Sequence, residues 1–304
     1  MNDQSPPIPL GRSYGLLAAV IMLWGINWPI MKMGLDYLSP LWFAAMRMGL
    51  GTICLFALLA VQGRFLWPGR RELAITVAVG ILQIGLPTGL LHAGLLYVEA
   101  GRSAILVFTI PLWVAPIAYF VLDERLTAAK VGGLVLGLAG IAVLFNPQDF
   151  PFGDRNALIG NGFMLLSSLS FAVALIVIRR HSWTVPIIRL MPWQMLLGTA
   201  LLAVAAAAIE GRPEVRWSAP LALIMAYNGP IASAFCFWAF VSVSRSLPAM
   251  STALGSLGVP VLGIVSSSVI LGEGFGLAKI AGLVLISLGV AAVTMADAVL
   301  SRRP

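Results

Sequence analysis

Apolar residues run along this chain in about ten nearly unbroken stretches of roughly 20 residues, and short polar segments separate them. A stretch of this length crosses the hydrocarbon core of a bilayer as a helix. A transmembrane barrel would instead show alternating polar and apolar residues, which these stretches lack. The pattern predicts an all-α integral membrane protein with ten transmembrane helices. They are expected at 14–33, 41–61, 73–98, 103–122, 131–145, 157–178, 188–209, 219–241, 250–271 and 277–298.

The sequence repeats itself between its two halves. Residues of the first half recur at a constant offset: Pro111, Leu122, Glu124, Lys130, Gly133, Leu134 and Gly140 correspond to Pro260, Leu271, Glu273, Lys279, Gly282, Leu283 and Gly289. A weaker repeat pairs Leu50-Gly51-Thr52 with Leu197-Gly198-Thr199 and sets Arg47 opposite Gln194.

A turn-rich linker at 147–156 separates five apolar stretches from five. The chain therefore divides into a tail at 1–13, a first repeat at 14–146, a second repeat at 157–298 and a tail at 299–304. Because each half has an odd number of spans, the second half enters the membrane in the opposite orientation. We expect two inverted five-helix repeats around a central cavity.

The composition agrees with a membrane protein. Hydrophobic residues make up 60% and charged residues 10% of the chain, whereas soluble domains carry about a quarter charged residues. The net charge is +7, yet basic residues are about twice as frequent in the segments on the side of the N-terminus. The positive-inside rule then predicts cytoplasmic termini and an inner-membrane location, with no nucleic-acid partner. Cys54 and Cys236 lie in apolar stretches without metal-ligand spacing, so we expect no metal or cofactor.

The repeated block around Pro111 and Pro260, together with the run Trp24-Gly25-Ile26-Asn27-Trp28, resembles the drug/metabolite transporter superfamily. The similarity is to ten-helix members built from two EamA-type domains, among them the YddG-like exporters of aromatic and other amino acids. The resemblance implies that helices one, three, four, six, eight and nine line the cavity, with helices five and ten at the periphery. The sixth stretch departs from the pattern, because Ser168-Leu169-Ser170-Phe171 stands where a tryptophan–glycine pair is expected.

Two ionisable side chains lie within the stretches. His92 follows Pro87, which bends the third helix, so His92 either faces the cavity or donates to a backbone carbonyl between helices. Arg47 lies about two helical turns past Pro40, roughly 10 Å deep. We expect it to reach the headgroups or to pair with an acid such as Asp36; the alternative is contact with a substrate carboxylate.

Aromatic side chains cluster away from the helix ends, where interfacial belts would place them. As a set they indicate an apolar cavity wall, although lipid contact or core packing would explain each one singly. They are Trp24, Trp28, Phe108, Trp113, Phe171, Phe235 and Trp238. The uncharged polar residues that could orient a ligand there, or bond between helices instead, are Asn27, Gln83, Asn228, Ser251 and Ser256.

Proline and glutamate occupy equivalent places in the two repeats. Pro111 and Pro260 fall near the middle of the fourth and ninth helices, where they act as hinges or as fixed kinks. Glu124 and Glu273 end the same helices at opposite faces of the membrane. Each is either a hydrated loop acid or a gate residue that caps and closes its end.

These patterns favour a secondary transporter and no enzyme, since the sequence holds no hydrolase or nucleotide-binding motif. The expected function is export of small neutral or zwitterionic metabolites by alternating access. Large apolar or aromatic amino acids are the leading solutes, with other metabolites or drugs, or a passive channel, as alternatives. No carboxylate lies near the middle of a span, so we expect no obligatory ion coupling. The partners are the small-molecule solute and the lipid bilayer, and the protein is a monomer or a homodimer.

Overall fold

The structure is a computed structural model that describes residues 9–122, 127–144, 154–181, 185–246, 258–274 and 276–300. All regular structure in the described residues is helical. The first half contains α1 (Leu10–Gly34), α2 (Pro40–Val61), α3 (Arg70–Val79), η1 (Gly80–Gly85), α4 (Leu86–Leu95), α5 (Ala100–Val107), α6 (Ile110–Leu122) and α7 (Ala128–Leu144). The second half contains α8 (Arg155–Arg180), α9 (Ile187–Ile209), α10 (Ala219–Ala226), η2 (Tyr227–Phe235), α11 (Cys236–Ser246), α13 (Gly258–Leu271) and α14 (Leu277–Leu300).

The helices follow the predicted apolar stretches closely. Within the described residues, 7 helices are long and apolar enough to cross a membrane, and shorter apolar helices cover 131–144, 258–271 and 277–292. The third predicted stretch contains α3, η1 and α4, and the eighth contains α10, η2 and α11. The fourth is interrupted, because α5 ends at Val107 and α6 begins at Ile110. Large apolar side chains such as Ile53, Val204 and Val269 are exposed on the outside, as expected of helices that face lipid.

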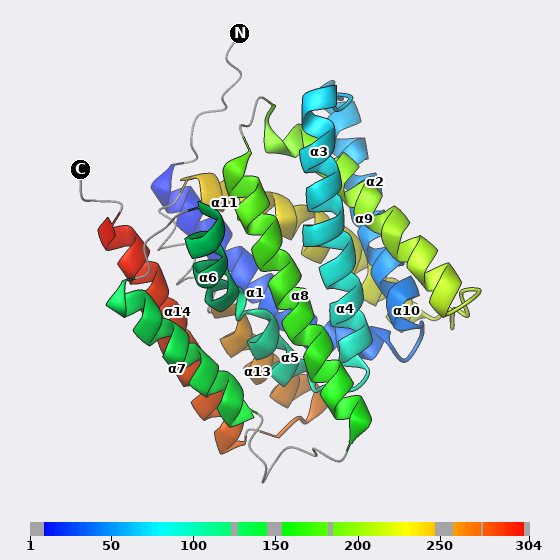
Figure 1. Cartoon of the computed structure of the whole chain (residues 1–304). Coiled ribbons are helices and arrows are strands. Elements are labelled where there is room, and N and C mark those ends of the chain that lie inside the picture. The colour runs from blue at the N-terminus through cyan, green and yellow to red at the C-terminus, as the bar shows by residue number, and fades with distance from the viewer. Residues whose placement is uncertain are drawn as a thin grey trace.

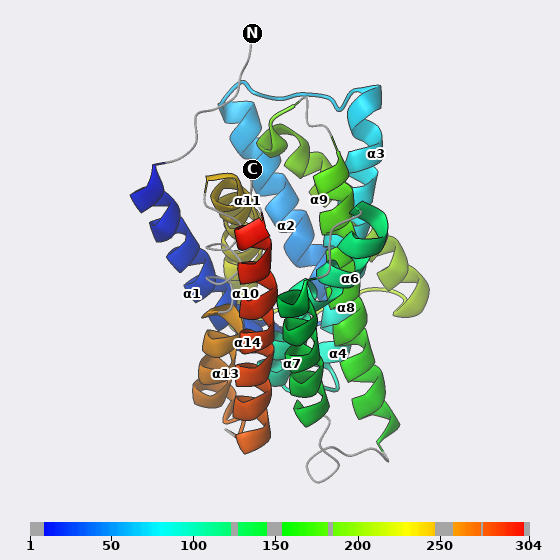
Figure 2. The same ribbon diagram turned by 60° about the vertical axis from the view of Figure 1, so that its left-hand side comes forward.

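The start of α1 and the end of α14 lie at one end of the bundle, whereas α7 ends and α8 begins at the other end (Figure 1). The helices α7 and α14 lie side by side, at the left edge of the bundle in Figure 1 and in front of it in Figure 2. Small residues allow this close approach: a Cβ on Gly140 would lie 2.9 Å from the carbonyl oxygen of Gly282. The small-residue faces of the fifth and tenth stretches thus pack on each other within the chain.

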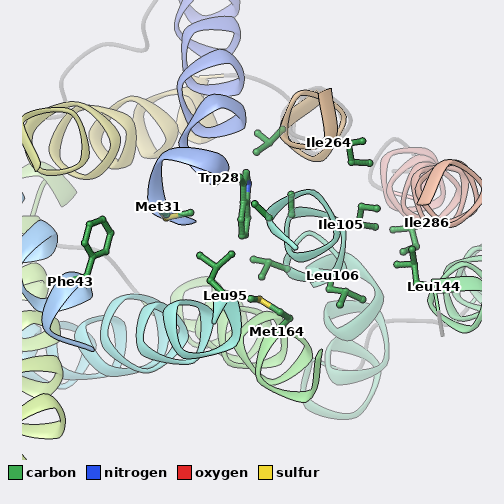
Figure 3. Close-up of a cluster of buried hydrophobic side chains, with 14 of the residues drawn as sticks. Trp28, Met31, Phe43, Leu95, Ile105, Leu106, Leu144, Met164, Ile264 and Ile286 are labelled. Carbon is green, nitrogen blue, oxygen red and sulfur yellow. The ribbon is translucent and has the colours of Figure 1, made fainter. Parts of the chain in front are cut away.

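The main hydrophobic core extends from α2 to the α7–α14 pair. Figure 3 shows Trp28 of α1 beside α5 and α13, the helices that supply Ile105 and Ile264 to the same core. Leu144 and Ile286 meet at the far side, where α7 and α14 join the bundle. Because these side chains come from both halves of the chain, neither half is expected to bury its apolar surface alone.

The packing of the two halves is reciprocal. The helix α2 packs against α9 and η2, and α9 packs against α2 and η1. A Cβ on Gly198 would lie 2.9 Å from the carbonyl oxygen of Gly80, and a Cβ on Gly51 would lie 3.2 Å from that of Gly229. Each glycine therefore lets its helix approach the π-helical segment of the other half.

Candidate functional site

A buried arginine and a buried histidine meet between α1, α2, α4 and η2. Arg47 on α2 is 4% exposed, and His92 on α4 is 0% exposed. Nη1 of Arg47 lies 3.5 Å from Nε2 of His92, and Nε of Arg47 donates to Oγ of Ser233 at 3.3 Å. Nη1 also contacts the sulfur of Met31. Segments from both halves of the chain thus converge on one guanidinium.

A backbone contact fixes which nitrogen of His92 faces Arg47. Nδ1 lies 2.7 Å from the carbonyl oxygen of Thr88, which can only accept, so Nδ1 carries the proton. Nε2 then offers its lone pair to the guanidinium of Arg47. The ring of Phe43 packs against the imidazole, with ring centroids 5.4 Å apart.

The expectation that Arg47 reaches the headgroups or pairs with Asp36 is wrong. Asp36 is exposed, and no carboxylate in the described parts of the chain lies within ion-pair distance of Arg47. The estimate of depth from Pro40 considered one helix, whereas α1, α4 and η2 cover the guanidinium on its other sides.

The segment η1 is a π-helical turn between α3 and α4, and η2 is a π-helical turn between α10 and α11. A π turn leaves a carbonyl without its regular helical partner, and inside a membrane that carbonyl needs another donor. In η1, the carbonyl oxygen of Leu82 accepts from Oγ of Ser170 at 2.8 Å. In η2, the carbonyl oxygen of Ala232 accepts from Nε1 of Trp24 at 2.9 Å. Ser170 on α8 therefore serves η1 as Trp24 on α1 serves η2, which gives a physical reason for serines in the sixth stretch.

The predicted aromatic residues lie in several different places. Trp24 packs against Phe237 and Phe240 of α11, with ring centroids 5.6 and 5.3 Å apart. Trp28 is buried in the main core, and the half-buried Phe108 lies at the break between α5 and α6 and packs against that core. Trp24 and Phe108 both pack against the core that contains Trp28, whereas Trp113 is not among the side chains packed there.

The remaining predicted aromatics are half-buried. Trp113 lines an apolar groove between α6 and α7, with Pro116 and Leu138 among its neighbours. Phe235 and Trp238 pack together with ring centroids 5.9 Å apart, where η2 meets α11. Phe171 lies on α8, one residue after the serine that bonds to η1.

Two of the predicted polar residues, Asn27 and Asn228, lie one helical turn from residues that contact Arg47. Asn27 is buried on α1, one helical turn before Met31, and its Oδ1 has no hydrogen-bond partner among the described residues. Asn228 is buried at the start of η2, five residues before Ser233; its Nδ2 donates to the carbonyl oxygen of Ile224 at 3.0 Å, and its Oδ1 has no partner in the described part of the chain. Gln83 is half-buried in η1. Ser251 and Ser256 lie outside the described residues.

Of the predicted hinges and gates, Glu124 lies outside the described residues. Pro111 is the second residue of α6, so the fourth helix breaks just before it and not at it. Thr109 stabilises that break, because its Oγ1 donates to Leu106 at 2.7 Å and lies 3.0 Å from Oγ of Ser168. Pro260 is buried in the first turn of the described part of α13.

Glu273 and Lys32 bind opposite sides of the short connection between α4 and α5. The carboxylate of Glu273 accepts from the backbone N–H groups of Ala100 and Gly101, at 2.6 and 3.0 Å. Nζ of Lys32 donates to the carbonyl oxygens of Leu95 and Val98, the latter at 2.9 Å. An acid at the start of α5 and a base at the end of α4 both complement the helix dipoles.

A salt bridge of 2.5 Å between Lys279 and Glu99 joins α14 to the same connection. We refer to Glu273, Lys32, Glu99 and Lys279 as the α4–α5 tie. It joins α1, α13 and α14 to the connection, and Glu273 is thus more than a hydrated loop acid. Lys32 was missed from the sequence, because only its place at a helix end was visible there.

Glu210 is another residue that the sequence did not single out. Its carboxylate accepts from Oγ of Ser39 at 2.6 Å and from the backbone N–H groups of Leu41 and Trp42 at 2.9 and 3.1 Å. The available signal was Pro40 at the first position of α2, because such a helix start still needs an acceptor for its next N–H groups.

Comparison with known proteins gives consistent relatives. The chain is 30% identical over 284 residues to the uncharacterized transporter YvbV of Bacillus subtilis, covering 92% of this chain and 90% of that protein. It is 25% identical over 297 residues to a probable amino-acid metabolite efflux pump of Salmonella typhimurium, covering 92% and 94%. A protein crystal structure matches the fold with a TM-score of 0.64 and 20% identity, covering 95% of this chain and 99% of that one.

The model of the EamA-like transporter family matches twice, at residues 10–146 and 158–295. The two matches cover most of the chain and fall in its two halves. With its apolar helices of membrane-spanning length, this chain belongs to the EamA-like transporter family.

Proposed function

We propose that this protein is a plasma-membrane secondary transporter that exports amino acids or closely related small zwitterions by alternating access. The observation that carries the proposal is the double match to a transporter family, joined by a relative named as an amino-acid metabolite efflux pump along almost its whole length. Other small metabolites or drugs remain the alternative solutes within the same function.

The proposal includes two inverted five-helix repeats, and the packing of the described helices supports it. Gly80 and Gly229 mark the two π segments and have the same offset as Pro111 and Pro260. Equivalent helices also make equivalent contacts with the opposite half: α1 of the first half packs against α13 and α11 of the second, and α8 of the second half packs against α6 and α4 of the first. Thr52 and Thr199 approach within 3.3 Å where α2 meets α9. A pseudo-two-fold axis through this contact, with the two chain halves in opposite orientations, accounts for all of these pairs.

With the termini in the cytoplasm, the α4–α5 tie lies at the outer face. The tie joins α1, α13 and α14 to the α4–α5 connection, so in this conformation the outer end would be closed around those helices. A passive channel would need a continuous polar path past this point. The tie and the core beneath it, including Trp28 and Leu95, therefore favour a carrier.

Counterflow in proteoliposomes tests the function. Vesicles loaded with unlabelled L-phenylalanine should transiently accumulate external labelled L-phenylalanine above the level that empty vesicles reach. A carrier gives this overshoot because exchange is faster than net movement. Uptake that equals simple equilibration in both vesicle types would contradict the carrier and favour a pore, and no uptake of any amino acid would contradict the proposed solute class.

A further inference from the structure

The charge of Arg47 is not balanced within the described part of the protein. Its guanidinium is 4% exposed and has five N–H groups, yet its contacts there are a hydroxyl, a thioether and a neutral ring nitrogen. A buried cation without an anionic partner is costly inside a membrane, where such groups are kept for function. The arrangement is that of a site for an anion that the described residues do not supply.

The surroundings specify the kind of anion. Lys32 follows Met31 on α1, and its ammonium group is engaged by the carbonyl oxygens of Leu95 and Val98. Arg102 is engaged by Asn161 at 2.9 Å and by the carbonyl oxygen of Leu144. The single positive charge of the Arg47 guanidinium then balances the single negative charge of a carboxylate. It would leave one of the two negative charges of a phosphate dianion without a partner. A planar guanidinium also matches the two oxygens of a carboxylate.

Two acceptors near the arginine lack donors. Oδ1 of Asn27 lies one turn along α1 from Met31, and Oδ1 of Asn228 lies one π turn along η2 from Ser233. Both oxygens are buried and have no donor within the described ranges, and each is on a helix that supplies a contact to Arg47. An ammonium group supplies the donors that such oxygens need.

We propose that Arg47 binds the carboxylate of the transported solute, and that the carbonyl oxygens of Asn27 and Asn228 receive its ammonium group. The inference rests on the proposed function and adds which group of the solute is recognised and by which residues. His92 acts as a positioning residue, because its neutral Nε2 accepts from Nη1 of Arg47 while Nδ1 is held by Thr88.

The test measures binding to the purified full chain by thermal stabilisation, since a ligand that binds only the folded state raises the midpoint temperature. The probes are L-phenylalanine, L-phenylalaninamide and 3-phenylpropanoate, which differ only in the carboxylate or the ammonium group. Wild-type protein should respond most strongly to L-phenylalanine. Arg47→Gln should raise the Kd for L-phenylalanine about 10- to 100-fold, the value of a charge-assisted contact, and should abolish its advantage over the amide. Arg47→Lys keeps the positive charge but loses the planar set of N–H groups of the guanidinium, so its Kd for L-phenylalanine should lie between those of the wild type and Arg47→Gln.

The control is Thr52→Val, which removes the contact of 3.3 Å to Thr199 on the same helix. It should lower the midpoint of the free protein and leave the preference for L-phenylalanine over its amide unchanged. An unchanged preference in Arg47→Gln or Arg47→Lys would overturn the role of Arg47, and so would a wild-type protein that binds the amide as well as the acid.

A failure of the amino-acid function is distinguishable. If wild-type protein responds to none of the three probes and shows no counterflow, the solute class in the proposed function is wrong. The role of Arg47 is then tested separately by thermal stabilisation with four other acids, each compared with its amide: acetate, lactate, succinate and benzoate. If one of the acids stabilises the wild-type protein and does not stabilise Arg47→Gln, the carboxylate site is supported. If none of the acids stabilises the wild-type protein, the site is overturned.

Discussion

Neutralising Glu273 should loosen the α4–α5 tie. The carboxylate accepts from two backbone N–H groups at the start of α5, at 2.6 and 3.0 Å. Glu273→Gln keeps one carbonyl oxygen as an acceptor but loses the charge and leaves the other N–H without its partner. A charge-assisted hydrogen bond contributes about 1.5–3 kcal/mol, and an acid at a helix start about 0.3–1 kcal/mol. Glu273 is half-exposed, so we take about 1.5 kcal/mol for the change, which corresponds to about tenfold in the equilibrium between tied and untied forms.

The reporter is a cysteine at Ser103, in a chain with Cys54→Ala and Cys236→Ala. Ser103 is fully buried on α5, close along the helix to the N–H groups that Glu273 binds, and its Oγ has no hydrogen-bond partner among the residues that the structure describes. Ser103→Cys is therefore a mild change whose thiol becomes reactive when the tied end opens. In intact cells, Glu273→Gln should raise the rate of labelling by a membrane-impermeant maleimide about tenfold.

Glu210→Gln is the matched control. Glu210 caps the start of α2 with the same chemistry but has no contact with α5. An unchanged labelling rate in Glu273→Gln would refute the idea that the tie holds this end closed. An equal rise in both variants would show general loosening of the bundle, which a fall in the midpoint of thermal unfolding would report independently.

Further predictions test orientation, packing and energetics. Cysteines placed at 64–71 should be labelled only from the cytoplasm, and those at 146–156 only from outside; cytoplasmic labelling of the second set would contradict the inverted repeats. Gly198→Val should destabilise the protein by about 1–3 kcal/mol, measured by thermal unfolding, because the new side chain meets the backbone of η1. Trp113→Ala should lower the unfolding midpoint and leave the ratio of transport rates for large and small solutes unchanged, since Trp113 faces α7. A pH gradient without a solute gradient should drive no uphill accumulation, and His92→Gln should not alter this result; accumulation that His92→Gln abolishes would make the histidine a proton carrier.

The helices could be predicted from sequence because the bilayer leaves the chain little choice. A run of apolar residues in hydrocarbon must satisfy its backbone internally, so length and composition fix both the type and the approximate ends of each element. The repeat was equally visible, because Pro111 and Pro260 head blocks with a constant offset. The family match at 10–146 and 158–295 agrees with the resemblance that those blocks carry.

The π segments could not be predicted in the same way. Gly80 and Gly229 indicate an irregularity in an apolar helix, but a kink, a break and a π turn all share that signal. What stabilises the π turns is a donor from the other half of the chain: Ser170 for η1 and Trp24 for η2. Trp24 looked like a cavity residue from its position along α1, whereas its indole N–H is engaged by this carbonyl.

The burial of Arg47 and the contacts of Glu273 were hidden for a related reason. The rise per residue along α2 gives the depth of Arg47, but whether a guanidinium reaches the surface depends on the helices that cover it. The partners of Glu273 lie 172 and 173 residues away along the chain, on α5. Sequence shows which residues are unusual for their surroundings, and tertiary packing decides what they bind.

The arginine site and the α4–α5 tie share two helices. On α1, Met31 contacts Arg47 and the next residue, Lys32, binds the end of α4. On α4, His92 contacts Arg47 and Leu95, one turn later, accepts from Lys32. Opening the tie would therefore move the segments that position the guanidinium, and an anion on the guanidinium would change which arrangement of those segments is favoured. Coupling of this kind is reciprocal in free energy, so a solute that binds more tightly in one arrangement must shift the tie by the same factor. Under the proposed alternating access no separate relay is needed, because α1 and α4 each carry one residue that contacts Arg47 and one that takes part in the contacts of the tie.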